Sequence, residues 1–140
     1  LKHFPGLGDT THDTHALPAK QLNTVFYNAG LQPFKQLQRL FPNAGVMLSH
    51  AQYPLDPDVP ASMSYHFQPM VSGFPLKFTD DVSMHALSVF GTPSERLDRA
   101  KYLGYITICM HNQLALQEYL QAPDHKPHAP RPSDSLSKNR

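Results

Sequence analysis

The chain has 140 residues, which is enough for one domain with a core of modest size. Its net charge is +1, so it lacks the positive field by which nucleic-acid-binding proteins attract phosphate, and its single cysteine excludes an intramolecular disulfide. Charged residues make up 16% of the chain, against about 25% in ordinary soluble domains, which favours a surface packed among neighbouring molecules.

Both ends of the chain read as extended arms. Residues 1–17 are interrupted by Pro5 and Gly6 and continue into a polar run, while residues 122–140 hold four prolines and one large aliphatic side chain, Leu136. Such segments bury too little apolar surface to offset the entropy of ordering them. We therefore expect both arms to gain order only against neighbouring protein subunits.

A pair of short helices is predicted after the first arm. Pro18 suits the first turn of a helix, and Gly30 is a natural stop. Between them, apolar residues recur at i, i+3, i+4 and i+7, at positions Leu22, Val25, Phe26 and Ala29. A second helix is expected from Pro33 to Phe41, ended by Pro42.

The middle of the chain, residues 42–78, is rich in proline and reads as a loop laid over a surface. Val46–Tyr53 fits a short strand or a turn of helix equally well. The alternation from Met63 to Phe67 indicates a strand, which could pair with Phe74–Phe78 through a Ser72-Gly73 turn. Because prolines flank both segments, we expect at most a short edge hairpin.

Two more helices are predicted in the last third. Thr79 or Asp80 should cap a helix that ends near Phe90. Thr92-Pro93-Ser94-Glu95 is a capping-box sequence, and the helix that it opens should continue to about Leu120. This long helix has apolar residues on both sides, which predicts burial on both sides, and its uncharged part is too short and too polar to span a bilayer.

The predicted fold is therefore mainly α. We expect a small helical domain at residues 18–121, with about four helices of which the last is long, and with the proline-rich loop 42–78 inside it. Extended arms at 1–17 and 122–140 flank this domain.

A metal site is the main candidate for binding chemistry. His12 and His15 have the i, i+3 spacing that can present two imidazoles to one ion, with Asp9 or Asp13 as an oxygen ligand. The segment carries no apolar scaffold, so this pair is a weak candidate. No cofactor is predicted.

Sequence motifs of common enzymes are missing. The chain has no GxSxG, GxxxxGK[ST] or GxGxxG pattern, and Asp80-Asp81 is explained as a helix cap. We therefore predict no catalytic or cofactor-binding residue and expect a protein that is not an enzyme.

The resulting hypothesis is a non-catalytic accessory subunit of a large multi-protein assembly. Its partners would be other protein subunits, contacted through both arms and the last helix, with no nucleic acid and no transmembrane span. A start at Leu1 is compatible with a removed leader, and low charge fits a mitochondrial membrane complex of the respiratory-chain or ATP-synthase type. The alternatives are a free-standing His-rich metal-binding or small enzymatic domain, and a protein that contacts a membrane peripherally.

Overall fold

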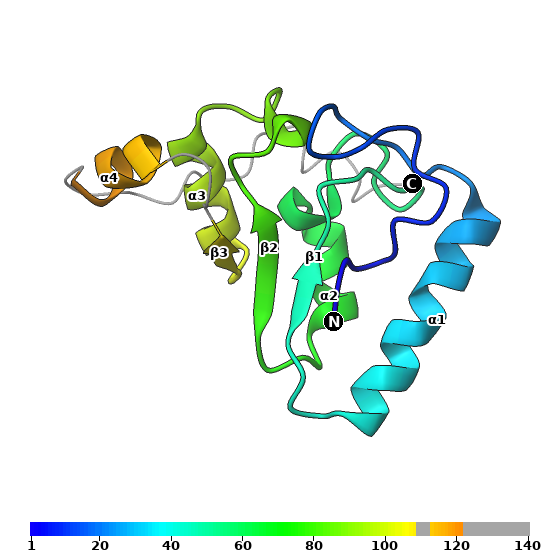
Figure 1. Ribbon diagram of the computed structural model, residues 1–140. Coiled ribbons are helices and arrows are strands. Elements are labelled where there is room, and N and C mark those ends of the chain that lie inside the picture. Colours follow the sequence, from blue (N-terminus) through cyan, green and yellow to red (C-terminus); the bar gives the residue numbers. More distant parts are fainter. Residues whose placement is uncertain (109–112, 122–140) are drawn as a thin grey trace, which may run out of the picture.

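A computed structural model describes residues 1–108 and 113–121 of the chain (Figure 1). Short strands alternate with helices along the sequence. The regular elements are α1 (Thr24–Leu40), β1 (Val46–Leu48), α2 (Gln68–Val71), β2 (Lys77–Asp81), α3 (Pro93–Tyr102), β3 (Ile106–Ile108) and α4 (Gln113–Gln121). Three single turns of 3-10 helix are η1 (Ala61–Met63), η2 (Tyr65–Phe67) and η3 (His85–Leu87).

The three strands form one parallel sheet in the order β1-β2-β3. Val46 pairs with Lys77 and Leu48 with Thr79, so β1 and β2 run in register along the whole of β1. The pairing of β2 with β3 contains an irregularity between Phe78 and Asp81. The prediction of a mainly α fold is therefore wrong: each strand is joined to the next through a helix, which is the connection that parallel pairing requires.

The N-terminal segment extends this sheet on the far side of β1. Phe4 forms a parallel bridge with Leu48, donates its N–H to the Met47 carbonyl at 2.7 Å and accepts from the Ser49 N–H at 2.9 Å. The Phe4 ring is 3% exposed and packs edge-on against Phe34 of α1, with ring centroids 5.2 Å apart. The predicted N-terminal arm is thus wrong at its start, because one buried aromatic ring and a strand ladder hold it. The predicted C-terminal arm, 122–140, lies outside the described residues.

α1 is one continuous helix, where two were predicted on either side of Gly30. Asn23 caps it by accepting from the Val25 and Phe26 N–H groups. Gly30 lies inside the helix because a Cβ at that position would come within 2.7 Å of the Pro5 carbonyl oxygen. The glycine therefore serves a close approach of two backbones rather than a helix end. Pro33 lies inside the helix, with its ring on the exposed side.

In the middle segment, the strand alternative for Val46–Tyr53 is confirmed for β1, whereas the hairpin is not formed. Met63–Phe67 folds into η1 and η2, and the chain then crosses through α2 before β2 joins β1 in parallel. The apolar residues from Met63 to Phe67 alternate with the period of a strand, but this segment forms 3-10 turns. Their buried members include Met63 and Phe67, both 0% exposed.

The last third also differs from the prediction. Thr79–Asp81 ends β2 instead of opening a helix. The capping box of Thr92 and Glu95 is confirmed, but α3 ends at Tyr102. Gly104 then takes a φ of +76°, a left-handed value that turns the chain into β3. Within the described residues, no helix has the length and apolar character needed to cross a bilayer.

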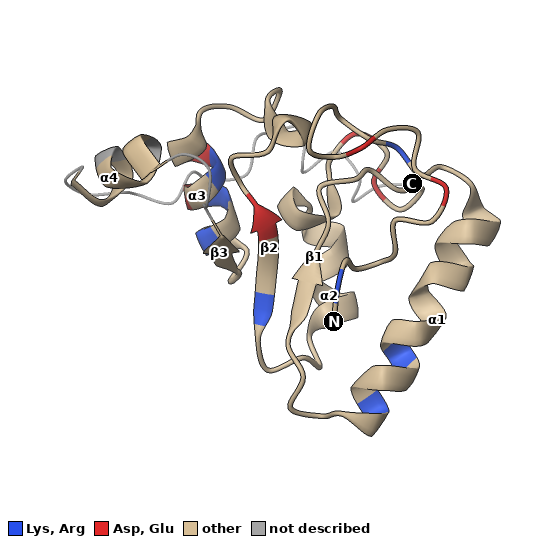
Figure 2. Cartoon of the chain, viewed as in Figure 1, with Lys and Arg blue, Asp and Glu red and all other residues tan. Residues whose placement is uncertain are grey.

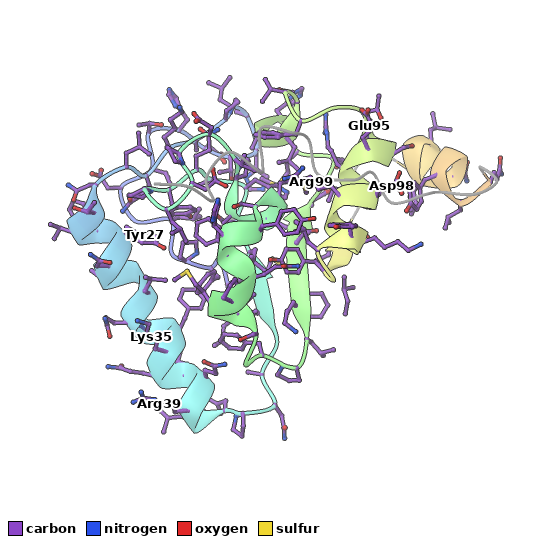
Figure 3. All side chains as sticks on the ribbon, turned by 180° about the vertical axis from the view of Figure 1, so that it is seen from behind. Tyr27, Lys35, Arg39, Glu95, Asp98 and Arg99 are labelled. Carbon is purple, nitrogen blue, oxygen red and sulfur yellow. The ribbon has the colours of Figure 1, made fainter. Side chains whose placement is uncertain are left out.

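Two clusters of buried side chains form the interior. The larger joins the N-terminal segment, α1, β1 and α2, and includes Phe4, Tyr53 and Phe67. The smaller lies between β2 and α3 and includes Val82 and Leu97. Figure 3 labels three charged side chains of α3: Asp98 accepts a hydrogen bond from the Tyr119 hydroxyl of α4 at 3.0 Å, and Arg99 donates to the Met63 carbonyl at 2.6 Å.

The close approach at Gly30 gives a stability test. In an open helix interior, Gly→Ala stabilises by about 1 kcal/mol. Here we expect Gly30→Ala to destabilise the protein by about 1–3 kcal/mol, because the new methyl group meets the Pro5 carbonyl. Asn28→Ala, at an exposed position of the same helix, is the control and should change stability by less than about 0.5 kcal/mol. Urea unfolding of both variants measures the difference, and a stabilised Gly30→Ala would contradict the packing described.

Candidate active site

Polar side chains gather at the carboxyl end of the parallel sheet, the edge at which such sheets place ligands. β2 ends in Asp80 and Asp81, which Figure 2 shows as the acidic tip of the strand. His50 follows β1 by two residues, and His3 lies beside the end of β1 because the next residue, Phe4, pairs with Leu48.

Asp80 and His3 face one another across this edge. The His3 Nε2 and Asp80 Oδ2 atoms are 3.5 Å apart, and the two side chains remain 26% and 19% exposed. Burial lowers the pKa of His3, and the charges of Lys2 and His15 lower it further, while the Asp80 carboxylate opposes them. The Asp81 N–H donates to Asp80 Oδ1 at 2.9 Å. Asp80 is therefore an oriented carboxylate that solvent, and so a ligand, can reach.

Asp81 has a different environment from its neighbour. It is 5% exposed, and its Oδ1 accepts hydrogen bonds from the Ser83 N–H at 2.9 Å and the Ser83 hydroxyl at 2.7 Å. These bonds close the turn that leads out of β2. Of the two carboxylates, Asp80 is thus the one placed for chemistry and Asp81 the one that shapes the backbone.

An imidazole–carboxylate pair lies on the loop between the N-terminal segment and α1. Asp13 Oδ1 is 2.8 Å from His15 Nδ1 and also accepts the His15 backbone N–H at 2.9 Å. These hydrogen bonds lower the pKa of Asp13 and keep it a carboxylate, so it accepts a proton-bearing Nδ1 and leaves Nε2 of His15 outermost. Both side chains are about 70% exposed, at 72% for His15 and 70% for Asp13.

Thr14 anchors this loop between the two exposed residues. Thr14 is 7% exposed. Its carbonyl oxygen accepts a hydrogen bond at 3.3 Å from the N–H of Ala86, which lies in the turn η3 after β2. The loop is therefore attached near the carboxyl end of β2. The effect of the His15 charge on the pKa of His3 agrees with this placement.

His50 is a buried link between strands. It is 1% exposed, with Nδ1 2.6 Å from the Ser62 hydroxyl and Nε2 2.8 Å from the Asp81 carbonyl oxygen. Burial lowers its pKa to about 4, against the opposing effects of the Asp81 carbonyl and of the Asp80 and Asp81 charges. His50 is thus a neutral imidazole at neutral pH.

The predicted metal ligands are not brought together as a metal site. His15 is paired with Asp13, and His12 Nδ1 lies 3.0 Å from the Thr11 hydroxyl. Across residues 1–108 and 113–121, no group of three or more His, Cys, Asp or Glu side chains has the arrangement that holds a metal ion. A metal at His12 and His15 stays a prediction.

Sequence reasoning missed His3 and Asp80 as functional candidates. His3 fell within the supposed arm, and Asp80 was interpreted as a helix cap. One signal could have found Asp80: it directly follows Phe78 and Thr79, residue types that favour strands, so a short strand was an alternative to the helix cap.

Comparison with known proteins identifies the family. Residues 1–122 match the family described as the glycosyl hydrolase family 3 N terminal domain. The chain therefore belongs to glycosyl hydrolase family 3, and its alternating strands and helices are those of the TIM-barrel-like N-terminal domain of that family. No curated protein sequence matches the chain.

Solved structures agree with this assignment. The chain is similar to a glycosyl hydrolase of family 3 from Mycobacterium smegmatis, with 26% identity and a TM-score of 0.74 over 86% of this chain and 41% of that one. LpqI of M. tuberculosis is 28% identical, with a TM-score of 0.71 over 86% of this chain and 38% of LpqI. A β-N-acetylhexosaminidase from Beutenbergia cavernae is 26% identical, with a TM-score of 0.69 over 85% of this chain and 38% of that enzyme. The chain thus spans about two fifths of the length of these proteins.

These findings correct the functional hypothesis. A non-enzymatic accessory subunit of a respiratory-chain or ATP-synthase complex is wrong, because the family is one of glycosyl hydrolases. The mitochondrial location is wrong as well, because the relatives just described come from bacteria. Contacts with other protein subunits through the arms and the last helix, and the lack of nucleic-acid binding, stay predictions.

The lowered pKa of His50 predicts acid-sensitive stability. Between its ordinary value of 6.5 and about 4, the unfolded chain binds a proton that the folded protein does not, so stability falls as pH falls through this window. The loss is on the order of 3 kcal/mol. The lowered pKa of His3 adds a loss of the same sign.

Urea unfolding between pH 7 and 4 measures this effect. His50→Gln should flatten the decline, whereas His85→Gln, which alters an exposed histidine, should leave it unchanged. An equally steep decline in His50→Gln would show that another group causes it.

Proposed function

We propose that this protein hydrolyses β-linked glycosides, with Asp80 as nucleophile and His15, held by Asp13, as general acid and base. The observation that carries the proposal is the reachable Asp80 carboxylate at the carboxyl end of β2, beside His3 and near the Asp13–His15 pair. N-acetylhexosaminides are the proposed substrate class, because a relative of 26% identity is a β-N-acetylhexosaminidase.

The first chemical step divides between these groups. An Asp80 oxygen attacks the anomeric carbon and forms a glycosyl ester, while the bond to the departing oxygen breaks and His15 gives that oxygen a proton. In the second step, water attacks the same carbon, His15 takes a proton from it, and the ester bond returns its electron pair to Asp80. A retaining outcome follows, because two displacements occur at one carbon.

The surrounding residues support this division of roles. Asp13 holds Nδ1 of His15, which fixes the ring with Nε2 outermost. His3 lies beside Asp80 and is a hydrogen-bonding group placed for a sugar hydroxyl group. The exposure of Asp13 and His15 suits a loop that a bound sugar would cover.

Asp80→Asn tests the nucleophile. We expect kcat for an aryl N-acetyl-β-glucosaminide to fall by at least about 10³-fold with a small change in KM, because an amide cannot form the glycosyl ester. Asp58→Asn, on an exposed loop, is the control and should keep full activity. An Asp80→Asn enzyme with activity close to that of the unaltered protein would refute the assignment.

His15→Gln tests the proton donor through the leaving group. For a phenyl leaving group, whose phenol has a high pKa, kcat should fall by about 10²–10⁴-fold, whereas a dinitrophenyl leaving group needs little protonation and its departure should be nearly unaffected. The glycosyl ester should then accumulate, because His15 is missing for the water step, and intact mass measurement with peptide mapping should locate it on Asp80.

The matched control for this variant is His12→Gln, on the same exposed loop. It should not alter the dependence on the leaving group. If kcat in His15→Gln fell by the same factor for both leaving groups, the imidazole would not be the proton donor.

A further inference from the structure

His50 and Ser62 form a buried pair that the proposed reaction does not use. Ser62 is 0% exposed, and its hydroxyl lies 2.6 Å from His50 Nδ1. The other ring nitrogen, Nε2, lies 2.8 Å from the Asp81 carbonyl oxygen, which can only accept a hydrogen bond. The hydrogen of the neutral ring is therefore on Nε2, and Nδ1 accepts from the Ser62 hydroxyl.

This imidazole continues the sheet where backbone pairing stops. The register of β1 with β2 ends at Leu48 and Thr79. Two residues further on, the His50 ring spans from the β1 side to the Asp81 carbonyl. On the other side, Asp81 pairs with Ile108, and the Val82 N–H donates to the Ile108 carbonyl at 2.8 Å. The end of β2 is thus held from both sides, by a side chain on one and by backbone on the other.

A second hydrogen bond connects this link to the reactive carboxylate. The Asp81 residue receives the His50 Nε2–H at its carbonyl and donates its own N–H to Asp80 Oδ1 at 2.9 Å. A shift of the Asp81 backbone would move the donor that orients Asp80. Displacements of about 1 Å at a reacting group can cost about 10²-fold in rate.

We infer that His50 is a positioning residue for Asp80, acting through the Asp81 backbone as a neutral imidazole with its hydrogen on Nε2. This inference rests on the proposed role of Asp80 in glycoside hydrolysis. The charged groups that act on the ring are Asp80 and Asp81 at the end of β2 and Arg96 of α3. Burial and Arg96 keep the ring neutral against the two carboxylates, which agrees with a ring that donates once and accepts once.

Two substitutions separate the two ends of the ring. In His50→Gln the side-chain amide reaches the place of Nε2 and can still donate to the Asp81 carbonyl. In His50→Asn the shorter amide reaches only the place of Nδ1, so the contact with Ser62 is kept and the donor to Asp81 is lost. We expect kcat for an aryl N-acetyl-β-glucosaminide to stay within about 5-fold in His50→Gln and to fall by about 10–100-fold in His50→Asn, with KM little changed in both.

Nuclear magnetic resonance of the whole protein gives a readout that does not need activity. In the unaltered protein, the nitrogen shifts of His50 should show a protonated Nε2 and an unprotonated Nδ1 at pH 7. At pH 7, the carboxyl carbon shift of Asp80 should be the same in the unaltered protein and in His50→Gln, and different in His50→Asn. Ser62→Ala removes the partner of Nδ1 but not the donor to Asp81, so it should leave the Asp80 carboxyl shift unchanged.

The outcomes distinguish this inference from the proposed function. If Asp80→Asn keeps full activity while the Asp80 carboxyl shift of the other variants still depends on the identity of residue 50, glycoside hydrolysis through Asp80 is refuted and the positioning link stands. If His50→Gln and His50→Asn lose activity equally, or if the hydrogen is found on Nδ1, the inference about His50 is overturned. Should His50→Asn fail to fold, the inference is still tested by which ring nitrogen of His50 carries the hydrogen and by the effect of Ser62→Ala on Asp80.

Discussion

Parallel strand pairing is the constraint on which the rest of this structure depends. Parallel strands begin at one edge of a sheet and end at the other, so residues far apart in sequence meet at the carboxyl edge. Here that edge collects His3, His50 and Asp80 from three separate strands or strand ends. The cost of this arrangement is a helical connection between each pair of strands, which is why helices dominate the sequence pattern and hide the sheet.

Local signals were readable from the sequence because they depend on a few neighbouring residues. The capping box of Thr92 and Glu95 needs one hydroxyl, one carboxylate and a spacing of three, and it forms as expected. Three residues of the predicted apolar stripe, Val25, Phe26 and Ala29, lie on α1, although they are exposed and Leu22 precedes the helix. The extent of that helix was misjudged, because Gly30 looks the same as a helix end and as a contact point. Only the position of Pro5 in space distinguishes the two.

The sheet was not readable for a physical reason. β1 and β3 have three residues each, too few for an alternation of buried and exposed positions to be recognised. β3 also lies within an apolar run that helical periodicity fits, and the turn at Gly104 that separates it from α3 carries no second signal. The N-terminal segment also carries no pattern that predicts its pairing with β1, since Phe4 alone is buried and bridged to Leu48.

The interpretation of Asp80 and Asp81 as a helix cap affected both the predicted secondary structure and the predicted site. In the first turn of a helix, two adjacent carboxylates would both complement the helix dipole and both remain in solvent. At the end of a strand, successive side chains point to opposite faces, so the same two residues receive different environments. Asp81 then closes the turn with Ser83, and Asp80 faces His3 within reach of a ligand. Because of the strand conformation, Asp81 has a structural role, whereas Asp80 is available for chemistry.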